Sequence, residues 1–479
     1  MIASQIALGL FSLLGYLLTL FLLPVVLLTK KQQPTSTVAW MLVIVTMPIF
    51  GAILFLIFGI NRVHRRLRSR QMVAAIVNRT SPRVASHHQL TSEPMAPLHR
   101  AMMQLSHKIS GTRPTVGNEV LVLTETSIAI REIEAAIAAA RSSIHLEYYI
   151  WQPDRIGTRV RDLLIAKAKE GVKVRFLYDS LGSMRLTRRF MQPMRDAGIE
   201  VATFVPGQTF RERWSLNLRS HRKIIVVDGQ VGFTGGMNIG DEYLGRSPHF
   251  GYWRDAHVRL IGPTVLQLQD VFSLDWRYAT GEDLTDSELY PVPPSRGNVV
   301  AQVIAGGPDE EDGVFHRLLF SAINEARNHV VLATCYFVPT PSLMSALENA
   351  ALRGVRVRIL VSGRVVYWYT HYAARSFYDS LLEAGAEVFE YERGQQHAKT
   401  LVIDGEWAFV GTPNFDARSV FLNFEVGVAM YDAGIAEQLE ADFDQAIQDA
   451  LRIDKESWLR RGTWQKVREN FCRMFSPVL

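Results

Sequence analysis

One pattern of side chains occurs twice in the 479-residue chain. It reads His-x-Lys, four residues, Asp, six residues and then Gly-x-x-Asn. The first copy contains His221, Lys223, Asp228, Gly235 and Asn238, and the second contains His397, Lys399, Asp404, Gly411 and Asn414. A pattern with five matched positions rarely recurs by chance. We therefore interpret the two copies as a duplication that brings two imidazoles and two ammonium groups to one active site.

The sequence around the motif repeats as well. Residues 135–146 resemble 321–332, residues 171–177 resemble 354–360, and residues 197–201 resemble 384–388. Each repeated unit is a helix followed by a strand with glycine between units, which is typical of an α/β sheet. A proline-rich stretch at 291–294 separates the halves. We expect two similar α/β domains, at 118–292 with the motif at 221–238 and at 293–479 with the motif at 397–414.

Each motif has the composition of a strand and a hairpin. The β-branched run 223–227 predicts a strand that begins at His221, and a period of two places His221 and Lys223 on the same face. Asp228 and Asp404 each precede a glycine, as in a two-residue turn. One interpretation is that these aspartates fix the turn and also bind the lysine. The other gives them a catalytic role, and on either interpretation their loss should inactivate the protein.

Two further carboxylates are candidates to orient the histidines. Asp255 lies 34 residues after His221, and Glu425 lies 28 residues after His397, each at the predicted start of a strand. A nucleophilic imidazole needs an acceptor on its second nitrogen, which fixes the tautomer and stabilises developing positive charge. We expect Asp255 and Glu425 to be these acceptors rather than ordinary surface acids.

The amino terminus predicts a membrane hairpin at 1–61. Residues 1–29 carry no charged side chain, and segments 6–28 and 38–60 are each long enough to span a hydrocarbon core. A cleaved signal peptide is the alternative, but no basic residue precedes the first apolar run and a second one follows at once. The link holds two lysines and five arginines lie in 62–70, which predicts cytoplasmic catalytic domains.

Charge and cysteine content limit the remaining functions. The net charge is +5, and the basic juxtamembrane part of the linker at 62–117 accounts for it, so no nucleic-acid partner is expected. Its arginines suit an anionic membrane surface. The two cysteines lack metal-ligand spacing, and no zinc site is expected. The oligomeric state stays open, and an oligomer is allowed.

At its duplicated motif the chain resembles the phospholipase D superfamily, whose pattern is His-x-Lys-x4-Asp followed by Gly-Ser-x-Asn. The resemblance covers residues 120 to 444. With the two-span amino terminus, the chain is most similar to the bacterial members that transfer lipid phosphatidyl groups. Gly236 departs from the pattern, because serine is usual there, and Thr412-Pro413 takes the corresponding place in the second copy. A hydroxyl donor to phosphate is therefore in doubt in the first half, where a backbone N–H can substitute.

The resemblance implies two tandem domains with a shared active site and phosphodiester chemistry without metal or cofactor. His221 would attack phosphorus and His397 would act as acid and base, while the motif lysines, with Asn238 and Asn414, hold the phosphate oxygens. The implied reaction joins two phosphatidylglycerols into cardiolipin and releases glycerol, at the bacterial cytoplasmic membrane. A hydrolytic phospholipase D, a membrane-anchored nuclease and an inactive scaffold are the alternatives.

Aromatic residues gather in two carboxyl-terminal stretches. Tyr367, Trp368 and Tyr369 are consecutive, and Trp464 and Phe471 lie near the basic end of the chain. Such residues suit a membrane interface, but aromatic clusters are more often part of a core. We expect the core arrangement.

Overall fold

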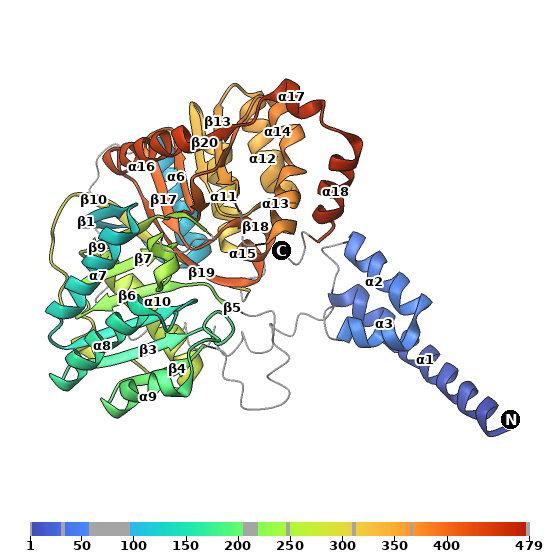
Figure 1. The fold of residues 1–479 in the computed structure, drawn as a ribbon, viewed down its shortest axis with the longest axis horizontal. Coiled ribbons are helices and arrows are strands. Elements are labelled where there is room, and N and C mark those ends of the chain that lie inside the picture. The colour runs from blue at the N-terminus through green and yellow to red at the C-terminus, as the bar shows by residue number, and fades with distance from the viewer. Residues whose placement is uncertain are drawn as a thin grey trace. The chain divides into compact units, whose positions relative to one another are not determined.

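The computed structural model describes residues 2–29, 34–56, 96–204, 219–245, 250–308, 313–364 and 367–475. The chain divides into two compact units (Figure 1), of which one holds residues 1–69 and the other holds both motifs. The predicted basic segment at 62–70 and the following linker up to residue 95 lie outside the described residues.

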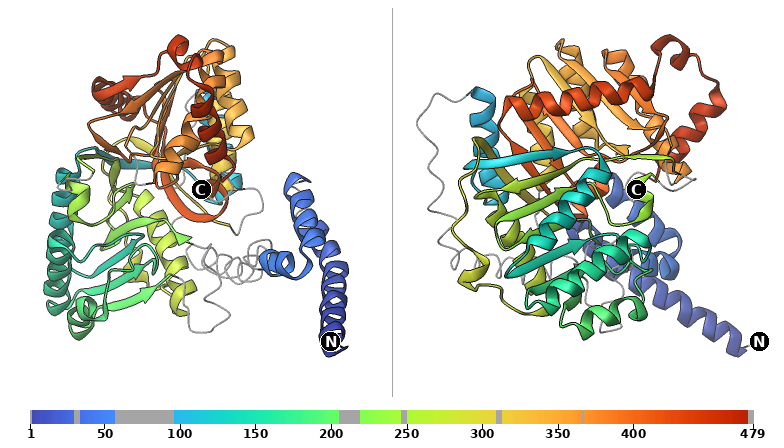
Figure 2. Two further views of the ribbon diagram at one scale, coloured as in Figure 1. Left: turned by 45° about the vertical axis from the view of Figure 1, so that its right-hand side comes forward. Right: turned by 60° about the vertical axis from the view of Figure 1, so that its left-hand side comes forward.

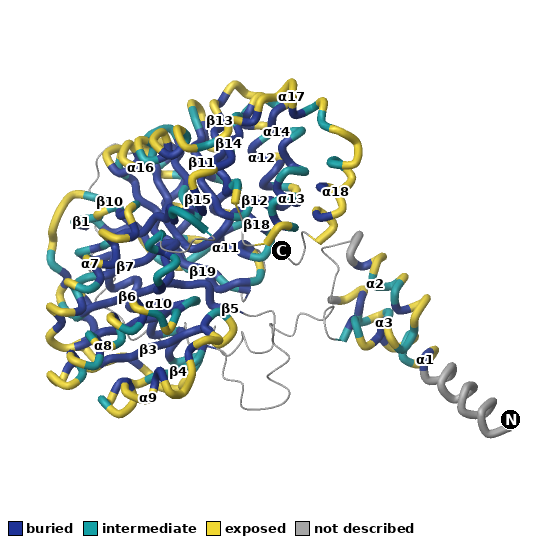
Figure 3. Tube along the Cα trace, viewed as in Figure 1, coloured by how far each residue is buried: buried dark blue, intermediate teal, exposed yellow. Residues whose placement is uncertain are grey.

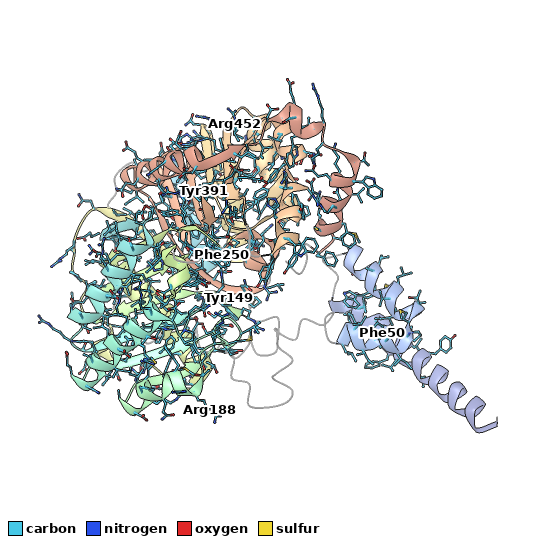
Figure 4. All side chains as sticks on the ribbon, viewed as in Figure 1. Phe50, Tyr149, Arg188, Phe250, Tyr391 and Arg452 are labelled. Atoms are coloured by element: carbon cyan, nitrogen blue, oxygen red, sulfur yellow. The ribbon has the colours of Figure 1, made fainter. Side chains whose placement is uncertain are left out.

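The amino-terminal unit is helical. It contains α1 (Ile2–Thr29), α2 (Pro34–Thr46) and α3 (Pro48–Leu54). The predicted second span is therefore not one helix. Met47, with φ −133° and ψ 70°, separates α2 from α3 because the ring of Pro48 disfavours helical geometry in the residue before it. Large apolar side chains are exposed on this unit, among them Phe50, labelled in Figure 4. Within the described residues, no helix combines the length and hydropathy that crossing a membrane requires.

The second unit is built on one large sheet. Among the described residues sixteen strands belong to it. The first half supplies β1 (Thr115–Leu123), β2 (Ser143–Tyr148), β3 (Lys173–Tyr178), β4 (Glu200–Thr203), β6 (Lys223–Val227), β7 (Val231–Gly235) and β9 (His257–Ile261). The second half supplies β10 (Val299–Gly306), β11 (His329–Ala333), β13 (Arg356–Ser362), β14 (Glu387–Tyr391), β16 (Thr400–Ile403), β17 (Trp407–Gly411), β19 (Asn423–Met430) and the edge strand β20 (Ala450–Arg452). The short β5 (Arg219–Ser220) pairs with β19.

The two halves have the same strand order. From the outside inward the first half runs β4-β3-β2-β6-β7-β9-β1, and the second runs β14-β13-β11-β16-β17-β19-β10. The motif strands β6 and β16 occupy the same place in each series. At the centre β1 pairs antiparallel with β10, with Thr115 opposite Ala301. The predicted duplication of an α/β domain is confirmed, and the halves share one continuous sheet.

Helices cover both faces of each half (Figure 2). In the first half α7 (Thr126–Ala139), α8 (Arg155–Lys169) and α9 (Arg188–Asp196) contribute to one core, and α10 (Thr264–Thr280) contacts several strands. In the second half α11 (Val314–Glu325), α12 (Pro341–Leu352) and α14 (Tyr378–Ala384) share a core, and α16 (Ala433–Ala446) contacts β16 and β17. All of β2 is buried, because Ile144 and Leu146 face the first core while His145 packs on Phe272 of α10.

One helix departs from the expected division of the chain. The sequence predicts a linker up to residue 117, but α6 (Pro97–Ser110) packs with α11 in the core of the second half through Leu98, Met102 and Met103. Burial of these three apolar side chains favours docking over a free linker. The predicted boundary at 117 also falls inside β1, which begins at Thr115.

The two motif aspartates stabilise hairpin turns, as one of the two interpretations of the sequence proposed. Asp228 and Asp404 have positive φ values, 53° and 55°, and each precedes a glycine that also has positive φ. This is the backbone of a tight hairpin turn. The Asp228 carboxylate accepts hydrogen bonds from the backbone N–H groups of residues 141, 142 and 143, and Asp404 accepts equivalent bonds from residues 327, 328 and 329. Each aspartate thus fastens its turn to the strand next to it.

Candidate active site

The backbone at each histidine is hydrogen-bonded to the opposite half. The N–H of His221 donates to the carbonyl of Phe424 at 2.9 Å, and the N–H of His397 donates to the carbonyl of Arg254 at 2.7 Å. The motif strands therefore begin later than predicted, at Lys223 in the first half and at Thr400 in the second. Each histidine is bound across the boundary between halves instead of within its own strand ladder.

The orienting carboxylates cross the same boundary. Nδ1 of His221 lies 2.9 Å from Oε2 of Glu425, and Nδ1 of His397 lies 2.7 Å from Oδ2 of Asp255. Both carboxylates are fully buried. In the sequence each carboxylate follows the motif of its own half, whereas in space each one contacts the ring of the other half. Both candidate acceptors are therefore in contact with a motif histidine.

These contacts define which ring nitrogen is reactive. Burial alone would raise the pKa of the Glu425 carboxyl, but His221 and Lys223 hold that pKa below its usual value. His397 and Lys399 likewise hold the pKa of Asp255 down against the effect of burial. An ionised carboxylate accepts a hydrogen bond from Nδ1–H, so in a neutral ring the lone pair lies on Nε2. Both imidazoles present a basic Nε2.

The charges around the rings make the two histidines one electrostatic group. Burial lowers the pKa of His221 to about 4; Glu425 opposes this effect, and Lys223 and Lys399 add to it. Burial also lowers the pKa of His397 to about 4, with Lys399 and Lys223 acting in the same direction against Asp255. Each ring is thus influenced by the lysines of both motifs. At neutral pH both imidazoles are uncharged in the free protein.

The two lysines are buried beside the histidine backbones. Nζ of Lys223 donates to the carbonyl of His221 at 2.7 Å, and Nζ of Lys399 donates to the carbonyl of His397. Burial lowers the pKa of Lys223 to about 7, despite the attraction of Glu425, and burial also lowers the pKa of Lys399. An ammonium group has three protons, of which each carbonyl takes one. A bound anion would offset the cost of burying these two cations.

The motif asparagines occupy different environments. Oδ1 of Asn238 accepts a hydrogen bond from the N–H of Ile150 at 3.2 Å. Oδ1 of Asn414 is buried, and no hydrogen-bond partner for it exists among the described residues. The motif aspartates belong to the turns described above, where Asp228 binds the backbone before β2 and Asp404 binds the backbone before β11. Neither the lysine contact nor a catalytic contact predicted for these aspartates is among their hydrogen bonds.

Two aromatic residues at the site were not predicted from the sequence. The ring of Tyr149 packs edge-on against His221 at 4.9 Å between centroids, and the ring of Trp253 lies 5.1 Å from His397. Tyr149 also lies under Nζ of Lys223, and in Figure 4 its label is where the two halves meet. The only sequence signal was position, because Tyr149 directly follows the buried strand β2 and Trp253 is two residues before Asp255.

Gly236 of the first motif and its counterpart Thr412 of the second have different side-chain space. A Cβ atom at Gly236 would lie 2.0 Å from Oδ1 of Asp255, so a side chain here would collide with the carboxylate that binds His397. In the second half the corresponding Thr412 fits, and its hydroxyl donates to Oε2 of Glu425. Glycine thus stands where the facing carboxylate is the aspartate Asp255, whereas a residue with a hydroxyl, Thr412, stands where the facing carboxylate is the longer Glu425. The described residues contain no group of three or more His, Cys, Asp or Glu side chains suited to a metal ion.

Two protein-family models match the chain. The model described as "Cardiolipin synthase, PLD-like domain" matches residues 133–273 and 319–447, which contain the two motifs. The model described as "Phospholipase_D-nuclease N-terminal" matches residues 15–59. These two matches cover more than half of the chain.

Relatives of known function are similar over nearly the whole length. A protein of Alkalihalophilus pseudofirmus named cardiolipin synthase is 38% identical over 97% of this chain and 93% of its own. A cardiolipin synthase of Geobacillus kaustophilus is 39% identical over 98% of this chain and 94% of its own. The crystal structure of phosphatidylserine synthase of Haemophilus influenzae has a similar fold, with a TM-score of 0.60 at 14% identity, and it covers 80% of this chain and 100% of that one.

The fit between Gly236 and Asp255 can be tested by copying the second half into the first. Gly236→Thr should displace Asp255 from His397 and lower activity about 10- to 100-fold, the usual effect of losing an outer partner of a reactive histidine. Adding Asp255→Glu recreates the Thr412 and Glu425 arrangement and should restore part of the rate. Initial rates with phosphatidylglycerol are the measurement.

A matched control for this pair is Gly462→Thr, because no atom lies near a Cβ at position 462. Equal activity of Gly236→Thr and Gly462→Thr would contradict the proposed collision, as would a double variant no more active than Gly236→Thr alone.

Proposed function

The chain belongs to the family of cardiolipin synthases with phospholipase D-like domains, and we propose that it joins two phosphatidylglycerols through a phosphohistidine intermediate. It is a phosphatidyltransferase. The observation that supports the mechanism best is the crossed pairing of two neutral imidazoles with two buried carboxylates. Each carboxylate binds the Nδ1 side of its ring and leaves Nε2 available, so that one Nε2 can attack phosphorus while the other, once protonated, gives its proton to the leaving oxygen.

In the first step Nε2 of His221 attacks the phosphorus of one phosphatidylglycerol. The P–N bond forms while the bond from phosphorus to the glycerol headgroup breaks, and the leaving oxygen takes a proton from Nε2 of His397. The lysines Lys223 and Lys399 neutralise the phosphate oxygens, and Asn238 and Asn414 help to hold them. The carboxylate of Glu425 stabilises the positive charge that develops on the His221 ring.

In the second step His397, now neutral, removes a proton from a hydroxyl of the second phosphatidylglycerol. That oxygen attacks phosphorus, the P–N bond breaks, and cardiolipin leaves with His221 restored. The proton for the first step comes with substrate binding. An anionic phosphodiester offsets the lysine charges that help to lower the pKa of His397, so binding raises this pKa and the ring can become protonated.

Transfer and hydrolysis differ only in the acceptor. Purified full-length protein in phosphatidylglycerol vesicles should form cardiolipin and glycerol in equal amounts, because a bound second headgroup excludes water. The products are measured by chromatography of labelled lipid. His221→Ala and His397→Ala should each lose most of the activity, and a phosphorus label should be found on His221. Phosphatidic acid as the sole product would defeat the transfer proposal.

The choice of nucleophile follows the superfamily resemblance, because the two rings have equivalent partners and pKa values. Mapping the label therefore tests this choice separately. Label on His397 would reverse the roles of the two rings, and label on a lysine would contradict the mechanism.

The affinity for phosphatidylglycerol should depend on pH through Lys223. Its pKa is about 7, and the ammonium group is charged below that value and neutral above it. KM should therefore rise with pH, approaching about tenfold per pH unit above 7. Initial rates at several substrate concentrations between pH 6 and 8.5 measure this effect. In Lys223→Arg the cation does not titrate in this range, so the slope should be lost. A KM of the original chain that is constant over this range would refute the role of Lys223.

We also propose that residues 1–61 anchor the protein as a membrane hairpin with its catalytic unit in the cytoplasm. The first 29 residues have no charged side chain, and the 28-residue α1 is about 42 Å long at 1.5 Å per residue. Apolar side chains are exposed along α1 and α2, including Phe21, Leu28 and Leu42. Basic residues are more numerous after the second segment than in the link, which sets the orientation.

Thiol accessibility in intact cells tests this topology. A cysteine placed in the link by Gln32→Cys should react with a membrane-impermeant maleimide from outside. The control Ile128→Cys, at an exposed position on α7 of the catalytic unit, should react only after the membrane is opened. Reaction of both variants, or of neither, in intact cells would contradict the hairpin.

A further inference from the structure

The last helix among the described residues exposes large apolar side chains instead of burying them. In α18 (Thr463–Arg473) only Glu469 and Cys472 are buried against the protein, and Glu469 is 0% exposed. Apolar side chains face the outside: Trp464 is 85% exposed, and Met474, just after the helix, is 73% exposed. Figure 3 shows exposed residues along this helix at the edge of the second half.

The exposed apolar residues form one stripe. Trp464, Val467 and Phe471 lie three or four positions apart, a spacing that places side chains on a single face of a helix, and Met474 and Phe475 continue this face three and four positions after Phe471. All five are more than 40% exposed. A soluble surface helix normally buries such a stripe, so the exposed stripe indicates a surface that is covered in use.

Polar contacts hold the helix in this orientation. Glu469 forms an ion pair with Arg461 at 2.9 Å, and Arg468 lies over the ring of Tyr372 at 3.8 Å. Arg473 lies over the ring of Phe377 at 4.3 Å. Because the charged residues are engaged with the protein and with α13 (Trp368–Arg375), the helix cannot turn its apolar face inward without breaking them.

The segment that carries the stripe has an excess of positive charge. Between residues 455 and 475 there are six lysines and arginines and only two acids. One of these acids is the buried Glu469, which is paired with an arginine. Exposed apolar side chains flanked by lysine and arginine match an anionic membrane surface, where the apolar groups enter the acyl boundary and the cations meet headgroups.

The same surface continues toward the active site. Tyr367 and Trp368, at the start of α13, are 51% and 63% exposed. Trp368 contacts Tyr372, the ring that also binds Arg468 of α18. Burial raises the pKa of Tyr149, the residue packed on His221, and Asp179 and Tyr367 act in the same direction. The expected core arrangement is thus wrong for these exposed residues.

We propose that α18 and the start of α13 dock the catalytic unit on the anionic bilayer. This inference rests on the proposed lipid function, because phosphatidylglycerol has to pass from the bilayer to His221. With α18 lying in the headgroup layer, Tyr367 and Trp368 line the route by which a headgroup leaves the membrane for the site. The docking surface belongs to the catalytic unit, so it would attach the protein to the membrane in addition to the proposed amino-terminal hairpin.

A fluorescent probe on α18 of the full-length protein in phosphatidylglycerol nanodiscs tests the docking. Val467→Cys is labelled with an environment-sensitive nitrobenzoxadiazole, and Ile128→Cys on α7 is the matched control. Both positions are exposed apolar residues on helices, whereas native Cys335 and Cys472 are buried. Emission from position 467 should shift to shorter wavelength and be quenched by lipids with brominated acyl chains. Emission from position 128 should do neither.

Two outcomes would overturn the docking proposal. One is emission at position 467 as in water. The other is a shifted emission that brominated lipid does not quench, which would mean that protein covers the stripe, either the amino-terminal helices or a second copy of the chain. Quenching equally strong in phosphatidylcholine nanodiscs would overturn the part played by charge. This measurement needs no turnover, so it is decided independently of whether cardiolipin is formed.

Rates give a second test. Trp464→Gln with Phe471→Gln should lower turnover in phosphatidylglycerol vesicles about tenfold, and leave turnover in detergent micelles within about twofold, because micelles deliver lipid without docking. Equal rates of the variant and the original chain in vesicles would count against the surface. An equal loss in vesicles and micelles would show that the substitutions act on the fold and would also contradict it.

Discussion

The active site depends on two imidazole–carboxylate pairs that cross the boundary between the halves. His221 is oriented by Glu425, and His397 by Asp255, while the backbone N–H of each histidine is bound to the residue before the same carboxylate. Neither half contains both members of such a pair. The shared sheet, the central pairing of β1 with β10 and the duplicated turns all serve to hold these two crossings at fixed distance and register.

The same arrangement buries positive charge that an anionic substrate would compensate. Two lysines are buried beside two ionised carboxylates, and each lysine affects both rings. Burying charges is unfavourable unless they are paired, so a site of this kind is stable only at some cost to the fold. In the proposed mechanism an anionic phosphodiester between the lysines relieves that cost where the reaction occurs. On this proposal the neutral rings of the free protein acquire opposite roles only when the substrate is present.

Much of this organisation could be predicted from the sequence, since the repeated motif and the repeated helix–strand units are local patterns. The turns at Asp228 and Asp404 followed from their Asp-Gly pairs, and the carboxylates Asp255 and Glu425 from their positions after the motifs. The crossed pairing could not, because it joins residues far apart in the sequence that meet near the centre of the sheet, where the two halves pair. Docking of α6 on the second half was missed for the same reason, as was the collision that excludes a side chain at Gly236.

The order of elements along the chain bears on its synthesis. The ribosome releases α6 before any strand of the second half exists, so Leu98, Met102 and Met103 have no partner surface until more than 200 residues later. His221 likewise precedes Glu425 by 204 residues. A nascent chain therefore carries one finished motif with no acceptor for its ring. The two crossed pairs can therefore be complete only after the ribosome has passed residue 425.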